Sequence, residues 1–324
     1  MGQGTEVKTR PEPRVEIQEK GEVFFFYRPK VDKEAARGPD DVQRMYVVLR
    51  PESGERAVEE KQAPESGKEG KKKKHEDPDQ QAAGGGGSRE GGHGKQEVNI
   101  EERPLLRLIV MGRKSLPDPA KKSRPYWGYV ELVTTDVQDI KDALKEEEYT
   151  TATRGQRRRR PAARALGEGV YRILKHGAGR AHTHLVYKLE LPPRGEPQEA
   201  MHVEPEASYL IQIKNPEQRQ QATGGFAGLQ AKRRAAFPAH LQARFGSNRY
   251  AAADPPDLLN YEGCELLLIS ASDDVEEELG LELHTETEAG EDEDADERAA
   301  SCSDLVKMFG EVADVKPLLS GSWD

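Results

Sequence analysis

Arginine side chains are concentrated in one short stretch of this 324-residue chain. Residues 154–164 contain no acidic residue and six arginines, namely Arg154, Arg157, Arg158, Arg159, Arg160 and Arg164. Guanidinium groups bind carboxylates and phosphates in a planar fork, so the stretch predicts a strip that binds an anionic ligand or an acidic or phosphorylated partner. A nucleic acid is less favoured as the partner, because no aromatic residue between the arginines offers a base a stacking surface. A solvated linker and a nuclear localisation signal are the alternative interpretations.

A pair of histidines forms the second arrangement that could carry chemistry. His182 and His184 stand two residues apart at the start of an expected strand, so both rings point to one face and could share a phosphate or a metal. The alternating pattern places Lys188 and Glu190 on the same face, which predicts that this face is exposed. Spacing fixes no carboxylate or cysteine nearby as a further zinc ligand, so no metal is assigned. Two surface histidines without a role remain the alternative.

Searches for established catalytic motifs give nothing. The chain has no Gly-x-Ser-x-Gly, no His-Glu-x-x-His and no Gly-Lys-Ser/Thr sequence. The favoured hypothesis is a non-enzymatic binding module with a positively charged strip, and no cofactor is indicated. The alternative is an enzyme for a phosphorylated or anionic small molecule, with His182 or His184 as acid or base and Arg164 binding the anion.

Strands are the elements expected to position these residues. Alternation of apolar and polar residues, or short apolar runs bounded by turn residues, predicts eight strands, at 22–28, 44–50, 105–111, 127–134, 170–176, 183–191, 208–214 and 264–271. Residues 266–269 are apolar throughout, which favours a strand covered on both faces. Helices are expected from Thr135 or Asp136 through Leu144, at 273–279 before Gly280, and at 304–309 between Ser303 and Gly310.

Similar residues recur at similar spacing in the two halves of the chain. Tyr126, Gly128 and the Asp136-Val137 pair reappear 135 to 138 residues later as Tyr261, Gly263 and Asp274-Val275, and Tyr46 and Pro51 reappear as Tyr187 and Pro192. This recurrence predicts an α+β fold of two similar antiparallel β-meander-plus-helix units packed against each other. The expected organisation is a polar tail at 1–20, units at 21–148 and 167–283, a basic linker at 149–166, and a C-terminal helix and tail at 301–324.

Three segments carry a resemblance to a known family: residues 21–30, residues 112–119 and residues 253–263. In these segments the chain resembles a plant protein family that has bacterial relatives and no established activity. Some members of that family are named for a BTB/POZ domain, which is built largely of helices, whereas strands dominate the elements expected here. The resemblance implies a shared scaffold older than plants, and it implies no catalytic residue, cofactor or ligand.

Composition limits the remaining possibilities. Only 35% of residues are hydrophobic while 33% are charged, so part of the chain is expected to be disordered, namely the lysine- and glycine-rich insertion at 54–98 and the acidic segment at 284–300. The net charge of -10 hides the separation of the basic stretch at 154–164 from the acidic segment at 284–300. Cys264 and Cys302 form neither a disulfide framework nor a metal motif. With no apolar run long enough to span a bilayer, the sequence predicts a soluble intracellular protein of the cytoplasm or nucleus.

Overall fold

The computed structural model describes residues 4–11, 14–52, 104–150, 155, 157–177, 182–192, 195–218, 228–285 and 303–323, together with the backbone of 58–60 and 96–98. Most of the expected disordered insertion at 54–98 and of the acidic segment at 284–300 lies outside the described residues. Arg154 and Cys302 also lie outside them.

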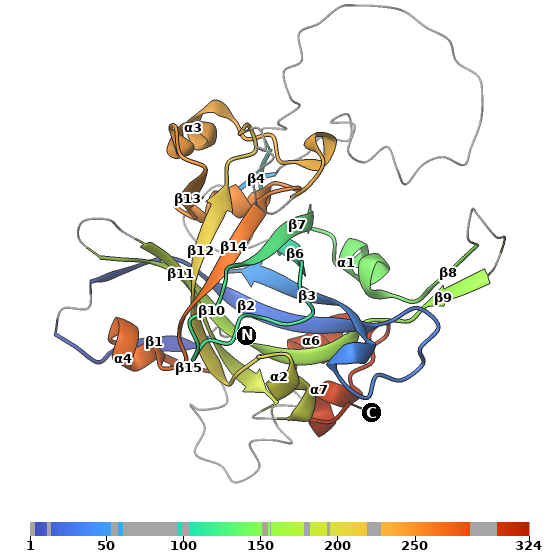
Figure 1. Ribbon diagram of the computed structural model, residues 1–324. Coiled ribbons are helices and arrows are strands. Elements are labelled where there is room, and N and C mark those ends of the chain that lie inside the picture. The colour runs from blue at the N-terminus through green and yellow to red at the C-terminus, as the bar shows by residue number, and fades with distance from the viewer. Residues whose placement is uncertain are drawn as a thin grey trace, which may run out of the picture.

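Eight antiparallel strands form one closed barrel (Figure 1). Their order around the barrel is β11-β10-β2-β3-β6-β7-β14-β12, and pairing of β11 with β12 closes it. The strands span Val15–Pro29 (β2), Val42–Pro51 (β3), Leu106–Met111 (β6), Tyr126–Thr134 (β7), Arg164–His176 (β10), His182–Leu191 (β11), Glu206–Lys214 (β12) and Glu265–Ser272 (β14). All eight strands expected from the sequence are the strands of this barrel.

The alternation of side chains along each strand divides the apolar residues between two sides of the barrel wall. On β2, Val23, Phe25 and Tyr27 belong to the inner cluster, which takes residues from all eight strands. Phe24 and Phe26 point outward into a second cluster. Because both sides of β2 are buried, the strand reads as a nearly continuous apolar run rather than as an alternating one.

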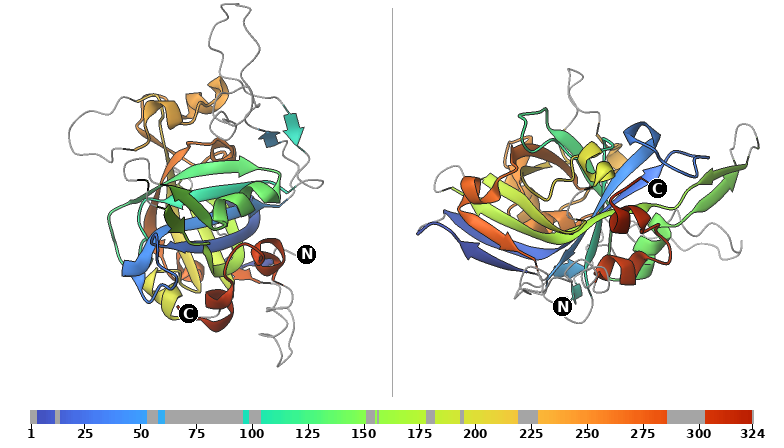
Figure 2. Two further views of the ribbon diagram at one scale, coloured as in Figure 1. Left: turned by 90° about the vertical axis from the view of Figure 1, so that its right-hand side faces the viewer. Right: turned by 90° about the horizontal axis from the view of Figure 1, so that it is seen from below.

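Short elements cover the two outer apolar clusters. Helices α1 (Val137–Leu144), α6 (Asp304–Phe309) and α7 (Lys316–Ser320) gather on one side of the barrel, over the cluster that contains Phe24 and Phe26 (Figure 2). Elsewhere, helix α4 (Val275–Leu279) and the strand pair β1 (Thr5–Lys8) and β15 (Leu281–His284) cover Leu174 and Val186.

The remaining elements lie at the ends and edges of the barrel. Strand β13 (Tyr250–Ala252) pairs with β12, β4 (Val58–Glu60) pairs with β5 (Gln96–Val98), and β8 (Glu147–Thr150) pairs with β9 (Arg157–Arg160). Helices α2 (Glu196–Ala200) and α3 (Ala239–Gln242) and four 3-10 turns complete the described part of the chain: η1 (Pro39–Asp41), η4 (Ala231–Arg233), η5 (Ala243–Phe245) and η6 (Pro256–Asn260).

Helix boundaries follow the capping residues expected from the sequence. The Asp136 side chain accepts a hydrogen bond from the backbone N–H of Gln138 at the start of α1, and the Asp274 side chain accepts one from Glu277 at the start of α4. Helix α4 ends at Gly280, whose φ of 66° lies in the left-handed region that glycine adopts without steric penalty. Ser303 caps α6 by accepting from the N–H of Val306.

The expectation of two separate packed units is not confirmed, because both halves contribute to one barrel. Each half supplies four consecutive strands, and these join edge to edge through the β10–β2 and β14–β7 pairs. The supposed equivalents Tyr46 and Tyr187 also point to opposite sides of the wall. Tyr46 belongs to the outer cluster and Tyr187 to the inner one.

Two expected boundaries also need correction. The supposed polar tail at 1–20 includes strand β1 and the first residues of β2. The supposed basic linker at 149–166 includes β9 and the start of β10. Both segments have few large apolar residues, but backbone pairing with a neighbouring strand needs no apolar side chain, so the hydrophobic pattern does not reveal such strands.

Candidate functional site

The consecutive arginines 157–160 form strand β9 of a two-stranded hairpin. Its partner β8 is acidic, and the register places Glu147 opposite Arg160 and Glu148 opposite Arg159. Arg157, Arg158 and Arg159 are exposed and Arg160 is half-buried. The hairpin stands clear of the barrel in Figure 1 and in the right-hand view of Figure 2. Three of its four arginines are therefore exposed, although Asp32 of the β2–β3 connection bonds to the backbone of Arg159.

A single buried arginine fastens the base of this hairpin to the barrel. Arg28, at the end of β2, is 2% exposed and donates from its Nε to the hydroxyl of Tyr46. Its other nitrogens donate to the backbone carbonyls of Lys145 and Pro161, which flank the hairpin, and to that of Ala143 in α1. One guanidinium thus ties both ends of the ribbon to the same point of the barrel wall.

Carboxylates hold most of the arginines of β9 in a row. Arg158 lies 2.6 Å from the Oδ2 of Asp32, and the backbone N–H of Arg159 donates to the other oxygen of Asp32. These two bonds hold the pKa of Asp32 below its ordinary value. Arg159 and Arg160 each lie 2.6 Å from a carboxylate of the acidic strand segment, Glu146 and Glu147 respectively. Among the described residues Arg157 has no ion-pair partner.

Arg164 occupies a different environment from the arginines of β9. It is only 8% exposed, at the first position of β10. Its guanidinium donates to the backbone carbonyls of Trp323 and Glu34 and lies 3.7 Å from the Oδ2 of Asp314. These contacts fasten the C-terminal residues to the barrel, so Arg164 is not presented to a ligand in the way the sequence suggested.

The two histidines differ from each other in exposure. His182 is exposed, but His184 is 2% exposed because α4 and its neighbours cover the outer face of β11. The Nδ1 of His184 lies 2.9 Å from the Oγ of Ser208 and 3.8 Å from the Oε1 of Glu278. Burial lowers the pKa of His184 to about 4, and the nearby His176 and His182 act in the same direction. The expectation that this face is exposed is therefore wrong at His184, and a neutral, buried ring cannot attract an anion.

The structure does not bring the histidines and Arg164 together. In the β10–β11 register His184 lies opposite Leu174, ten residues from Arg164 along β10. At about 3.3 Å per residue this corresponds to roughly 30 Å. The arrangement needed for the alternative enzymatic hypothesis, with His182 or His184 beside Arg164, is therefore not observed. Within the described ranges, no group of three or more His, Cys, Asp or Glu side chains is placed to hold a metal ion.

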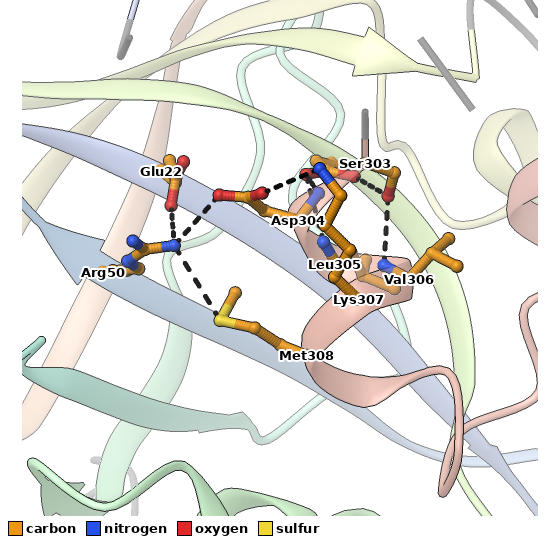
Figure 3. A network of polar contacts seen from close by, with 9 residues as sticks. Glu22, Arg50, Ser303, Asp304, Leu305, Val306, Lys307 and Met308 are labelled. Atoms are coloured by element: carbon orange, nitrogen blue, oxygen red, sulfur yellow. Dashed lines mark hydrogen bonds and ion pairs between the residues drawn. The ribbon is translucent and has the colours of Figure 1, made fainter. Parts of the chain in front are cut away.

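A buried carboxylate cluster, which the sequence patterns do not predict, lies on the outside of the barrel (Figure 3). Glu22 of β2 and Asp304 of α6 both approach the NH1 of Arg50 on β3, at 2.8 and 3.2 Å. Glu168 of β10 accepts hydrogen bonds from the hydroxyl of Ser303 and from the backbone N–H groups of Asp304 and Leu305. The one sequence feature that could have indicated this cluster is Glu22, a charged residue beside the apolar run 23–27.

A second buried polar network lies inside the barrel. Arg107 of β6 is 1% exposed and makes two parallel bonds to Glu19 of β2, at 2.6 and 2.9 Å. The hydroxyl of Tyr171 donates to the same carboxylate, and the Nε of Arg107 donates to the amide oxygen of Asn260. Although burial opposes it, the Glu19 carboxylate raises the pKa of Arg107. This network joins β2, β6, β10 and η6 near one end of the barrel.

Comparison with known proteins does not assign the chain to a family. No protein-family model, curated protein or solved structure matches it. No helix in the described ranges is both long and apolar enough to cross a membrane. Of the sites described above, the arginine strand of the β8–β9 hairpin is the most exposed.

Proposed function

We propose that the protein is a binding module that uses the β8–β9 hairpin to hold an extended acidic or phosphorylated segment of a partner protein. The observation that carries this proposal is the display of four consecutive arginines on a ribbon that projects from the barrel. The remainder of the protein serves as the rigid support, since Arg28 fixes both ends of the ribbon.

The spacing of the arginines fits an extended peptide. In a strand, alternate residues share a face at intervals of about 7 Å, so Arg158 and Arg160 lie on one face and Arg157 and Arg159 on the other. An extended acidic or phosphorylated peptide presents every second side chain at the same interval. Each face of β9 therefore matches two negative groups of such a segment, which guanidinium groups bind through charge-assisted hydrogen bonds.

The existing ion pairs of the hairpin are compatible with exchange. Arg158, Arg159 and their partners Asp32 and Glu146 are all exposed, and exposed pairs contribute only about 0 to 1 kcal/mol each. A phosphate group can displace such a carboxylate at little expense. A nucleic acid is less favoured as the partner, because Tyr149 of β8 already has its ring covered by the guanidinium of Arg160, 5.6 Å from the ring centre.

Removing two exposed arginines should weaken binding. A fluorescein-labelled peptide with phosphoserine at every second position is the probe, and affinity is measured by fluorescence anisotropy. The double variant Arg157→Gln/Arg158→Gln is expected to bind it about tenfold more weakly, since two exposed ion pairs of roughly 0.7 kcal/mol each are lost.

A matched control removes the same charge from another part of the surface. Arg244→Gln/Arg249→Gln changes two exposed arginines near α3 and β13, away from the hairpin. This variant should bind the phosphopeptide as the unmodified protein does. Equal losses in both double variants would show that only overall charge matters, and no loss in either would remove the hairpin as the site. Tighter binding of an oligothymidylate than of the phosphopeptide would contradict the choice of partner.

A further inference from the structure

Helices α6 and α7 of the C-terminal segment, residues 303–323, lie against the outside of the barrel, and Trp323 after them joins the inner cluster; we call this segment the clasp. Phe309 at the end of α6 packs edge-on against Phe24 and Phe26 of β2, with ring centroids 5.9 and 5.6 Å apart. Near its end, the Trp323 ring packs against Tyr27, and its carbonyl accepts from Arg164. The aromatic contacts favour docking, and polar contacts at both ends set its position.

The polar contact at the start of the clasp, around Asp304, contains more negative than positive charge. Glu22, Glu168 and Asp304 come together from β2, β10 and α6. Among the described residues Arg50 of β3 is the one cation that pairs with both Glu22 and Asp304. Lys307 of α6 approaches Asp304 at 3.7 Å, but its side chain is 52% exposed and its charge is correspondingly screened. On β11, Glu190 adds a further negative charge near Glu168.

Hydrogen-bond donors of α6 and of its cap surround Glu168, whereas Glu22 contacts Arg50 and the carboxyl group of Asp304. Glu168 receives Ser303 and two backbone N–H groups of α6, which stabilise its charged form against the effect of burial. Among the described residues Glu22 has Arg50 as its one positive partner, and it lies across the same guanidinium from Asp304. Two carboxylates that share one arginine in a buried site repel each other unless one of them holds a proton.

We propose that residues 303–323 form a proton-dependent clasp, which docks firmly while the Glu22 carboxyl group beside Asp304 holds a proton and loosens when that proton is lost. Loosening would separate Phe309 from Phe24 and Phe26 and expose an apolar face of the barrel. The device is independent of the β8–β9 hairpin, since none of its groups belongs to that ribbon.

The direction of the pH effect follows from Glu22. Burial, together with Asp304 and Glu168, raises its pKa from 4.5 to about 7, although Arg50 opposes the rise. The docked state therefore binds a proton that the released state gives up, so docking is fully stabilised below 4.5 and loses this stabilisation as the pH rises through about 7. Between about pH 6 and about pH 8.5 the docking equilibrium should fall by about tenfold.

Hydrogen exchange read by mass spectrometry measures this equilibrium directly. After correction for the intrinsic exchange rate, peptides from 303–323 should lose about tenfold in protection over that pH range, while peptides from β6 and β7 keep theirs. Glu22→Gln, which cannot ionise, should remove the pH dependence. Glu276→Gln, an exposed acid on α4, is the matched control and should leave it intact.

Two results would overturn the proposal: protection of 303–323 that does not change with pH in the unmodified protein, or a pH dependence that survives in Glu22→Gln. If Glu22→Gln does not fold, Asp304→Asn provides the second variant: burial remains, but the negative charge that helps to raise the pKa of Glu22 is removed, so the pH dependence should become smaller. A persistent tenfold change in Asp304→Asn would equally contradict the clasp.

Discussion

Replacing Arg107 by methionine should lower the free energy of unfolding by about 3 to 5 kcal/mol. The substitution removes the only cation that pairs with Glu19 among the described residues, and it leaves that carboxylate inside the barrel with the Tyr171 hydroxyl as its remaining donor. Removing one partner of a buried ion pair is costly because the other charge stays desolvated. Urea denaturation followed by circular dichroism measures the change.

Urea denaturation of a double variant distinguishes the cost of an unpaired buried charge from the cost of losing the ion pair itself. Arg107→Met/Glu19→Gln has no uncompensated charge and should recover a large part of the stability, because replacing both partners of a buried pair is often close to neutral. If Arg107→Met alone changed the free energy of unfolding by less than about 1 kcal/mol, the interior network would not hold the barrel together as described.

Replacing Arg28 by methionine should affect both stability and the hairpin. Three backbone carbonyls, those of Ala143, Lys145 and Pro161, would lose a charged donor. With about 1 to 3 kcal/mol for each buried group left unpaired, and incomplete additivity, the expected loss in unfolding free energy is about 3 kcal/mol. Amide hydrogens of strands β8 and β9 should exchange faster than in the unmodified protein.

The neighbouring strand offers a matched control for Arg28. Arg44 lies directly opposite Arg28 in the β2–β3 register, but its side chain is exposed. Arg44→Met should therefore change the unfolding free energy by no more than about 0.5 kcal/mol and leave exchange in the hairpin unaltered. Similar effects of both substitutions would mean that Arg28 does not fasten the ribbon. Phosphopeptide binding by Arg28→Met should weaken along with the hairpin exchange protection.

The barrel strands were predictable from the sequence, but their closure was not. Residues 22–28 and 208–214 read as strands because their apolar residues either run continuously or alternate. That pattern locates the strands, yet it does not show which strands pair, and the continuous run at 23–27 does not show which residues face inward. Closure depends on the β10–β2, β11–β12 and β14–β7 pairs, and two of these three join segments more than a hundred residues apart. Local patterns contain no information on such contacts.

The arginines of the candidate site were predictable from the sequence, but the residues that contact them were not. The arginines 157–160 were recognised from the sequence as a basic strip, but the acids that pair with them come from β8 and from Asp32, which is far away in the chain. His184 was expected to be exposed, because nothing in its own strand indicates that α4 and β15 cover it. Alternation of polar and apolar residues along one strand cannot show that a segment distant in the sequence buries a side chain of that strand.

The most direct test of the proposed anion-binding hairpin is to follow the side-chain Nε–H signals of the arginines by NMR while the phosphoserine peptide is added. We predict that the signals of Arg157–Arg160 shift most, and that the shifts diminish as salt is raised, since exposed charge pairs are screened. Shifts concentrated on arginines elsewhere, such as Arg244 and Arg249, or no shifts at peptide concentrations that saturate binding, would contradict the assignment of this hairpin as the binding site.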